Sequence, residues 1–503
     1  MKTGIVYTPR YWADWVVDTY GIADKWINGA LILDPGCGRG ALSEAIIRLA
    51  VGKGFKPSGK DLARLHGVDR DETALLAFRK NIDKHYGLKL SGNSLIFGDY
   101  LLKAPKVAAN VILANPPWIS FGDLNNEDKS AYKPIFRKSG LTPDPRSLLL
   151  GGSRIDLAAL FVAIALDRDM AKNGEGYFFL PSNLFRGEGA HSAFRRLKLP
   201  GGRSFALREL RELEGGEPFP GAGTRYCLAS YKADSPQFWP VPWFVAVPEG
   251  GWREMDARPV DGPGSPLVPY PAGSPPPPPP RIDVPAGAVP RQGVNCGGAS
   301  DAFILEEIGE DDNGRIPVVN KRGTRAYLPA EMVYPLMSPS CFIPGREIGE
   351  PERWIFLPYS RDGKILSTEI LKDHPDAEIW LERHKNHLVG RKGALLGRYA
   401  AKGLYWALLG VGPYTFAPWK LAWESYGRDR FVPRLFGSKD GVYWQGNQAL
   451  HAYIPFSGQK AAEDAFRDFK SPALEEYLRN LGGASTKSWA QPGRISRLLN
   501  PVT

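Results

Sequence analysis

Residues Leu31–Gly40 read LILDPGCGRG. Three apolar residues lead into an aspartate and a glycine-rich turn, a pattern typical of a buried strand that ends in a loop. Beyond the turn, apolar side chains recur at helical spacing at Leu42, Ala45, Ile46 and Leu49. A strand, a G-x-G-x-G loop and a helix form a nucleotide-type cofactor site, because glycines let the backbone approach a ligand and the helix N-terminus adds a favourable dipole.

The spacing within this loop narrows the choice of cofactor. The loop is not G-x-G-x-x-G and no Gly-Lys-Ser/Thr follows it, which disfavours the phosphate cradles of NAD and ATP sites. The alternative is a glycine turn that binds no ligand. The residues that suit the zwitterionic amino-acid end of S-adenosylmethionine are Asp34, Pro35, Gly36, Gly38 and Gly40. We therefore expect S-adenosylmethionine as the cofactor.

Two further strands are expected to carry acids near their ends. The first is Leu65–Asp69, and Asp69 at its tip can accept bonds from two ribose hydroxyls. It comes later than the usual offset of roughly 20 residues, and the Gly-, Lys- and Pro-rich stretch 51–61 is interpreted as an inserted loop. The second strand is Leu95–Tyr100, in which Asp99, next to Tyr100, is placed to bond an adenine amino group. Taken alone, each acid could instead be a helix cap or turn residue.

A tetrad of residues, Asn115, Pro116, Pro117 and Trp118, closes the apolar run Val111–Ala114. An exocyclic amine on an aromatic ring is a poor nucleophile, because its lone pair is spread into the ring. A side-chain amide oxygen and a backbone carbonyl can each accept one of its N–H groups, which aims the lone pair. Prolines stiffen the loop and donate no N–H, and the indole offers a face on which a planar base can stack. A proline-rich turn after a strand is the alternative.

Composition limits the protein class. The 503 residues should form two or three domains, and the net charge of +10 indicates a polyanionic partner. The four cysteines, Cys37, Cys227, Cys296 and Cys341, are too widely spaced for a C-x-x-C metal site or a disulfide framework, and fit a reducing cytoplasm. The seven histidines form no H-E-x-x-H cluster, so we expect no catalytic metal. No signal peptide and no apolar stretch of about 18 residues is visible, so we expect no membrane contact.

One domain boundary is indicated by residues 256–292, which are rich in Pro and Gly and include six consecutive prolines, Pro275–Pro280. Such a segment is expected to run as an extended, semi-rigid spacer. It would separate a catalytic domain at 1–255 from a second domain at 293–503. The alternating strands and helices of the first domain predict an α/β, doubly wound, Rossmann-like sheet with the cofactor at the carboxyl ends of its strands. We expect the second domain to be mixed α+β.

With these residues in place, the sequence resembles the N6-adenine DNA methyltransferases of the γ order, the Taq-type and Eco57I-type enzymes. The cofactor motifs and the Asn-Pro-Pro-aromatic tetrad match in type and order. Further matching segments are Tyr7, Thr8 and Pro9, which resemble the motif over the methionine part of the cofactor, the stretches 156–161 and 176–182, Phe219 in E-P-F-P, and 300–304. The resemblance is close from Tyr7 to Tyr226 and diffuse after Phe303.

The resemblance implies a function and a mechanism. It implies transfer of a methyl group from S-adenosylmethionine to N6 of an adenine flipped out of duplex DNA, in a restriction-modification or phage-defence system. Trp118 and Phe219 would stack on the two faces of the base. Asn115 and the Pro116 carbonyl would accept the two N6 hydrogens. The protein would be cytoplasmic and nucleoid-associated, with a separate restriction or defence subunit as a possible partner.

The C-terminal domain is expected to bind the DNA. Basic side chains interleave with aromatic ones between residues 383 and 426, which suits a surface that grips a duplex. A solvated helix face beside a core aromatic cluster is the alternative, and we favour it for most of the aromatics. The residues expected to contact DNA are Arg346, which lies in a G-R-E-I segment that the family often has, and Lys385, Arg391, Lys392 and Arg398.

Three alternatives stay open at this point. N4-cytosine methylation uses the same tetrad chemistry, although the order of motifs favours adenine. Methyltransferases of protein glutamine and of ribosomal-RNA guanine also use Asn-Pro-Pro-aromatic, but they usually lack a large C-terminal recognition domain. A non-catalytic DNA-recognition subunit is a third possibility, against which the intact Asp34, Asn115 and Trp118 argue.

Overall fold

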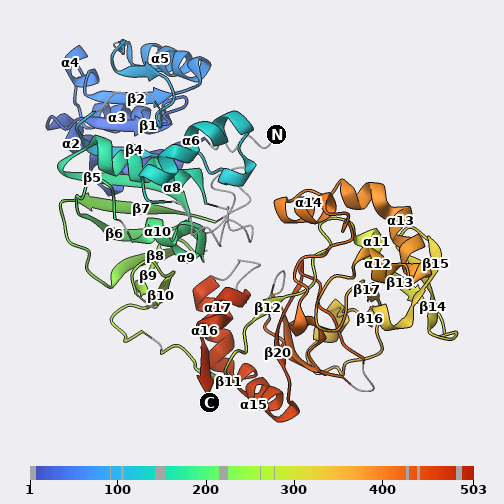
Figure 1. Cartoon of the computed structure of the whole chain (residues 1–503). Coiled ribbons are helices and arrows are strands. Elements are labelled where there is room, and N and C mark those ends of the chain that lie inside the picture. Colours follow the sequence, from blue (N-terminus) through green and yellow to red (C-terminus); the bar gives the residue numbers. More distant parts are fainter. Residues whose placement is uncertain are drawn as a thin grey trace. The chain divides into compact units, whose positions relative to one another are not determined.

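The computed structural model describes residues 7–90, 92–102, 107–141, 155–187, 189–196, 198–213, 225–247, 249–260, 262–276, 278–425, 430–438, 442–482 and 490–502. The chain forms two compact units, Met1–Pro276 and Pro277–Thr503 (Figure 1). In this described part, every helix is too short or too polar to cross a membrane.

Unit 1 is built on a ten-stranded sheet with the order β10-β9-β8-β6-β7-β5-β4-β1-β2-β3. Neighbours from β3 to β5 pair in parallel, and β7 lies antiparallel between β5 and β6. The strands are β1 (Ile32–Pro35), β2 (Leu65–Asp69), β3 (Leu95–Phe97), β4 (Ala109–Ala114), β5 (Met170–Pro181), β6 (Phe205–Glu212), β7 (Tyr226–Ala233), β8 (Val241–Ala246), β9 (Trp252–Pro259) and β10 (Leu267–Pro271).

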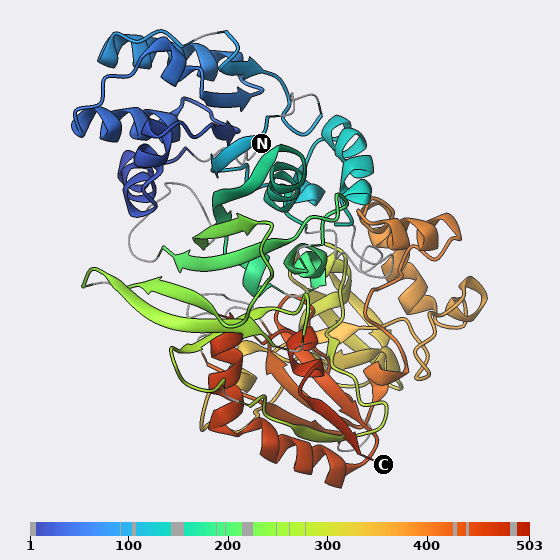
Figure 2. The same ribbon diagram turned by 90° about the vertical axis from the view of Figure 1, so that its left-hand side faces the viewer.

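Helices cover both faces of this sheet (Figure 1, Figure 2). Neighbouring residues of a strand point to opposite faces of the sheet and so enter different buried clusters. Leu33 of β1 and Ile112 of β4 belong to one cluster, and Ile32 of β1 and Leu113 of β4 belong to the other. The helices are α1 (Arg10–Thr19), α2 (Ile22–Ile27), α3 (Ala41–Gly52), α4 (Gly59–Leu62), α5 (Glu72–Tyr86), α6 (Asn126–Lys138), α8 (Leu157–Ile164), α9 (Asn183–Arg186), α10 (Ser192–Arg195), the short η1 (Phe121–Asp123) and η3 (Gly189–His191), and the π-helix η2 (Ala165–Asp169). The predicted doubly wound α/β fold is confirmed.

The expected spacer at 256–292 differs from the structure. Its first part completes β9 and forms β10, and these two strands extend the sheet of unit 1. Its last part forms β11 (Ile282–Pro285) and β12 (Arg291–Gln292), which pair with strands of unit 2. Proline is compatible with this arrangement because an edge strand such as β10 needs hydrogen-bonding groups on one side only. The compact units divide at Pro276 and Pro277, inside the expected spacer.

Unit 2 is mixed α+β, as predicted. It holds an antiparallel sheet of order β15-β14-β13-β17-β16, a second antiparallel sheet of order β12-β20-β18-β19, and the parallel pair β11-β21. The further strands are β13 (Ile304–Ile308), β14 (Arg315–Asn320), β15 (Arg325–Pro329), β16 (Val333–Pro335), β17 (Trp354–Phe356), β18 (Trp419–Glu424), β19 (Arg434–Gly437), β20 (His451–Phe456) and β21 (Leu499–Val502).

The helices of unit 2 pack on these sheets and bury aromatic side chains such as Phe303, Trp380 and Trp406. They are α11 (Ser300–Phe303), α12 (Thr368–Leu371), α13 (Pro375–Val389), α14 (Ala394–Ala401), α15 (Gln459–Phe469), α16 (Pro472–Gly482), α17 (Pro492–Ser496), and the short η4 (Ala330–Met332), η5 (Pro339–Phe342) and η6 (Pro413–Phe416). Several aromatics of the stretch 383–426 are therefore core residues, in line with the favoured alternative.

Candidate functional site

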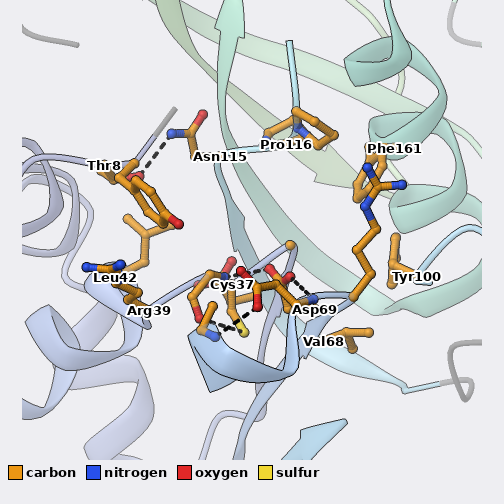
Figure 3. Close-up of a pocket in the computed structure, with 18 of the residues that line it drawn as sticks. Thr8, Cys37, Arg39, Leu42, Val68, Asp69, Tyr100, Asn115, Pro116 and Phe161 are labelled. Atoms are coloured by element: carbon orange, nitrogen blue, oxygen red, sulfur yellow. Dashed lines mark hydrogen bonds between the residues drawn. The ribbon is translucent and has the colours of Figure 1, made fainter. Parts of the chain in front are cut away.

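A cavity of about 470 Å³ opens at the carboxyl ends of β1 and β4 (Figure 3). Strand order reverses here, because β2 lies on one side of β1 and β4 on the other. Open α/β sheets bind ligands at such a switch point, and the volume suits a small molecule or cofactor. Among the expected site residues, those that line the cavity are Tyr7, Thr8, Asp34, Gly36, Gly38, Asp69, Asp99, Tyr100, Asn115, Pro116 and Pro117.

The glycine loop is shaped by a close approach at its last position. Gly40 has φ +79° and caps the N-terminus of α3. A Cβ added at Gly40 would lie 2.2 Å from the ring of Phe78 on α5, so only glycine fits. Residues of the loop before it also adopt positive φ angles, which turns the chain from β1 into α3. Pro35 ends β1 and lies outside the cavity lining.

Asp69 ties this loop to the second strand. One of its carboxylate oxygens accepts the backbone N–H of Gly38 at 2.7 Å, and the other accepts that of Asp71 at 2.8 Å. The backbone N–H of Gly36 donates to the Val68 carbonyl at 2.7 Å. Asp69 therefore holds the glycine loop in place and also lines the cavity. Each of its oxygens keeps a lone pair that can accept a bond from a ligand.

Asp34 is the buried acid of the cavity. Its side chain is 2% exposed, and neither carboxylate oxygen has a hydrogen-bond partner among the described residues. Burial, and next the negative charge of Asp69, raise the pKa of Asp34 well above its usual range. A buried carboxylate without a partner is costly unless a ligand brings a cation or donors. The ammonium group of S-adenosylmethionine fits this requirement.

The third strand brings two residues to the cavity in different ways. One oxygen of Asp99 accepts the hydroxyl of Tyr132 on α6 at 2.6 Å, and the other accepts the backbone N–H of Leu101. Tyr100 faces the cavity with its ring, while its hydroxyl donates to the buried Asp169 at 2.6 Å. Its expected role in cofactor binding is therefore limited to ring contact, because the hydroxyl is held by the protein.

The N-terminal segment lies across the glycine loop and reaches the tetrad. The ring of Tyr7 would be 3.4 Å from a Cβ at Gly38, and the Arg39 guanidinium lies 5.3 Å from the centre of that ring. The amide nitrogen of Asn115 donates to the hydroxyl of Thr8 at 3.0 Å (Figure 3). Pro9 precedes the first turn of α1 in an extended conformation. The Asn115 amide thus joins the N-terminal segment to the tetrad, although the two are more than a hundred residues apart in the sequence.

Trp118 is placed differently from the other tetrad residues. It lies outside the cavity lining, and its indole N–H donates to the backbone carbonyl of Phe179 on β5 at 3.2 Å. Its ring stacks on Tyr226 at the start of β7, with centroids 5.4 Å apart and planes inclined by 25°. One indole face is thereby covered by the protein. Phe219, the expected second aromatic, lies outside the described residues.

Several cavity residues were not predicted from the sequence. Phe161 of α8 lies 3.8 Å from a Cβ position at Gly36 and faces the loop, although the sequence placed it only in a matching stretch (Figure 3). Tyr132 and Leu124 enter the cavity from the region that follows the tetrad. Arg39 also lines the cavity, and the sequence could have indicated it because it lies between two glycines of the G-x-G-x-G loop. Nothing in the local sequence of α6 marks Tyr132.

The five basic residues expected to contact DNA lie in unit 2 and fall into three groups. Arg346, Lys392 and Arg398 are exposed. Lys385 is exposed and forms an ion pair with Glu382 at 2.7 Å. Arg391 differs from the other four because it is buried.

Arg391 is buried and acts as a structural residue. Its three guanidinium nitrogens donate to the backbone carbonyls of Leu388, Cys296 and Tyr405 at 3.0, 3.1 and 2.6 Å. Arg391 lies between α13 and α14, and its bonds tie this connection to the end of α13, to the segment before α11 and to the segment after α14. Burial and these three bonds give the side chain a structural role, so we do not propose Arg391 as a DNA-contacting residue.

The described residues hold no group of three or more His, Cys, Asp or Glu side chains placed to bind a metal ion.

No protein-family model and no curated protein sequence matches the chain. The fold is similar to that of MmeI, a type IIL restriction-modification enzyme solved in complex with DNA, over 96% of this chain and 63% of that chain, with 11% identity and a TM-score of 0.52. Two weaker similarities are to LlaGI, a type ISP restriction-modification enzyme solved with a DNA substrate mimic (14% identity, 60% and 35% of the two chains, TM-score 0.43), and to the M protein of the type I restriction enzyme EcoKI (14%, 48% and 48%, 0.35). The chain spans less than two thirds of the length of each of these proteins. The similarity to MmeI extends across both units and shows the fold of the chain.

Proposed function

We propose that this protein is an S-adenosylmethionine-dependent DNA methyltransferase that methylates N6 of adenine in duplex DNA. The observation that carries the proposal is the position of Asn115. Its amide is held by Thr8 at the end of β4, beside a cavity that contains a buried carboxylate and a glycine loop. An amide and a carbonyl fixed next to a cofactor cavity are what transfer to a conjugated amine requires.

Different cavity residues would bind different parts of the cofactor. Asp34 would pair with the ammonium group, which neutralises its buried charge. The second lone pairs of the Asp69 oxygens would accept ribose hydroxyls, and Asp99 would accept the adenine amino group. Tyr7 would cover the methionine part from above the glycine loop. When bound, the cofactor supplies an electrophilic methyl group.

The tetrad would prepare the target nitrogen. The Asn115 side-chain oxygen and the Pro116 carbonyl accept the two N–H groups of the amine, which moves electron density onto nitrogen and aims the lone pair. Thr8 holds the other end of the Asn115 amide and so fixes its rotation. No strong base is needed, because the amine becomes cationic as its new bond forms and then loses a proton. Catalysis rests on positioning and electrostatics.

The target base would reach the tetrad by rotating out of the duplex, because N6 is not accessible inside the stack. Trp118 would stack on one face of the base, and Phe219 on the other. We propose that unit 2 binds the duplex, and that the protein acts in the cytoplasm beside a separate restriction or defence subunit. The structural likeness to DNA-bound MmeI across both units supports a DNA substrate.

The proposal is tested by methyl transfer to DNA. Purified protein, radiolabelled S-adenosylmethionine and DNA that lacks N6-methyladenine should yield labelled N6-methyladenine after digestion to nucleosides. Methylation-sensitive sequencing of the same DNA would give the recognised sequence. Label in N4-methylcytosine, in RNA or in protein alone would replace the proposal with one of the other amine or amide methyltransferases.

Asn115→Ala is expected to abolish transfer while cofactor binding, measured by isothermal titration calorimetry, persists. Asn386→Ala, which removes an exposed amide on α13, is the matched control and should keep full activity. Substantial activity in Asn115→Ala would contradict the role of the tetrad.

A further inference from the structure

The hairpin formed by β14 and β15 in unit 2 has a basic tip. Lys321, Arg322 and Arg325 follow one another around the turn, and all three are exposed. The hairpin from Arg315 to Pro329 contains no acidic residue. β15 is an edge strand of the five-stranded sheet, and no described strand pairs with its outer side.

The tip is ordered by a buried side chain. Asn320 is 2% exposed, and its amide oxygen accepts the backbone N–H groups of Arg322 and Thr324, each at 3.0 Å. Its amide nitrogen donates to the Asp301 carbonyl at 2.7 Å. Gly323 completes the turn with φ +74°. The basic side chains are thus presented from a fixed backbone, which lowers the ordering cost of binding a partner.

Helix α13 adds a fourth cation to the tip. The Arg383 guanidinium donates to the backbone carbonyl of Arg325 at 3.3 Å, which places the Arg383 side chain against β15 near the tip. At the opposite end of the hairpin, Arg315 forms an ion pair with Asp376 in the first turn of α13. The helix therefore holds the hairpin at both ends, and Figure 1 shows α13 beside β15.

Counter-ions are scarce at this tip. Arg322 contacts Asp301 at 2.9 Å, and Asp301 also contacts His387 at 3.0 Å. In the part of the chain that the structure describes, no carboxylate lies within ion-pair distance of Lys321, Arg325 or Arg383. The acids Glu310, Asp311 and Asp312 precede β14 at its other end, roughly 17 Å away along a strand of this length. Charge is therefore segregated along the hairpin.

We propose that this basic hairpin, defined by Lys321, Arg322, Arg325 and Arg383, binds the phosphate backbone of duplex DNA. The inference rests on the proposed function and deepens it, because it gives unit 2 a DNA-contacting surface whose hairpin residues lie outside the stretch 383–426 that the sequence indicated. Arginine and lysine on a fixed scaffold suit phosphates, and each contact releases counter-ions from the duplex. The alternative explanation is that these charges on an edge strand only prevent the sheet from pairing with the sheet of another molecule.

The test is DNA affinity as a function of salt. The full-length variant Lys321→Ala/Arg325→Ala/Arg383→Ala is compared with Lys372→Ala/Lys460→Ala/Lys470→Ala, which removes the same charge from exposed positions of unit 2. Binding to a labelled duplex of arbitrary sequence is followed by fluorescence anisotropy between low and moderate salt. No recognition sequence is needed, because phosphate contacts are independent of sequence.

The slope of log K against log salt should become shallower by about 2 to 3 in the hairpin variant, and stay unchanged in the control. Lys321→Gln alone should change it by about 1, and this single exposed substitution keeps the test open if the triple variant misfolds. Equal losses in both triple variants, or an unchanged slope in the hairpin variant, would overturn the inference. Self-association of the hairpin variant with unchanged DNA binding would support edge protection instead.

Two further outcomes separate this inference from the proposed function. If the wild-type protein binds no duplex DNA, the proposed DNA substrate fails together with the inference. If it binds and methylates DNA while the hairpin variant keeps its salt slope, only the inference fails. Stronger competition by duplex RNA than by duplex DNA would also overturn the inference.

Discussion

At the scale of single residues, Trp118 shows why a position in a motif does not fix a role. The tetrad allows any aromatic ring, but here the indole N–H is bonded to the Phe179 carbonyl, and one ring face lies on Tyr226. Phenylalanine could not donate that bond. The indole is therefore held by the hydrogen bond at its edge and by the ring contact on one of its faces.

Trp118→Phe should weaken capture of the flipped base while it keeps an aromatic ring. Loss of one hydrogen bond costs about 1 kcal/mol, or roughly fivefold in affinity, and Trp118→Ala should cost more. The emission of 2-aminopurine at the methylation site reports capture. Trp354→Phe in unit 2 serves as the control. Equal emission from Trp118→Phe and the wild-type protein would show that the bond to Phe179 does not position the ring.

Asp34 links cofactor binding to pH. Because burial raises its pKa in the cofactor-free protein, the group favours folding at low pH, and that contribution is lost as pH rises through the raised pKa. Pairing with an ammonium group requires the carboxylate, so binding of S-adenosylmethionine should release a proton from Asp34 below that pKa. Affinity should increase with pH over the same range.

Calorimetry in two buffers of different ionisation enthalpy measures this proton release. Asp34→Asn should abolish it and bind the cofactor more weakly, whereas Asp123→Asn, at an exposed position, should behave as the wild-type protein. Identical proton release in Asp34→Asn would assign the linkage to another group.

At the scale of elements, the glycine loop and the Pro-rich strand show opposite outcomes of reasoning from the sequence. The loop was identified because glycine spacing governs the local backbone directly. The Pro-rich segment was interpreted as a spacer because a run rich in Pro and Gly is expected to be extended and semi-rigid. Within it, β10 pairs through one side only and buries Val268 and Tyr270. Edge position, which the sequence does not encode locally, made the difference.

Gly40→Ala tests the turn from β1 into α3. The added methyl group would meet Phe78 at 2.2 Å with φ at +79°, so we expect a loss of about 2 kcal/mol or more in unfolding free energy, together with loss of cofactor binding. Gly52→Ala, at the C-terminal end of α3 and with open space around its Cβ, should be neutral or slightly stabilising. Thermal unfolding of both variants checks the difference. A Gly40→Ala protein as stable as Gly52→Ala would contradict the predicted clash.

At the scale of the whole molecule, the chain divides into two units because β9 and β10 pair with the sheet of unit 1, whereas β11 and β12 pair with strands of unit 2. The cavity at the carboxyl ends of β1 and β4 is lined by described residues of unit 1, and the basic hairpin belongs to unit 2. Each unit has its own buried core. We therefore expect cofactor binding to survive removal of unit 2, and methyl transfer to DNA to be lost.

Two fragments test the boundary. A fragment of residues 1–276 keeps β9 and β10, whereas one of residues 1–255 loses β10 and half of β9 and exposes the edge of β8. The longer fragment should bind S-adenosylmethionine and unfold cooperatively, at a higher temperature than the shorter one. Equal melting temperatures would show that β10 does not stabilise unit 1.

The sequence alone was sufficient for the features that short-range chemistry controls. These include the strand, glycine turn and helix around Asp34, the acid at the end of β2, and the Asn-Pro-Pro loop after β4. Packing between distant segments controlled the rest. It brought Thr8 to Asn115 and Tyr132 to Asp99, buried Arg391 and covered one face of Trp118. A periodic pattern specifies which side of an element is buried, but the partner of each side chain follows from the order of strands and the contacts between sheets and helices.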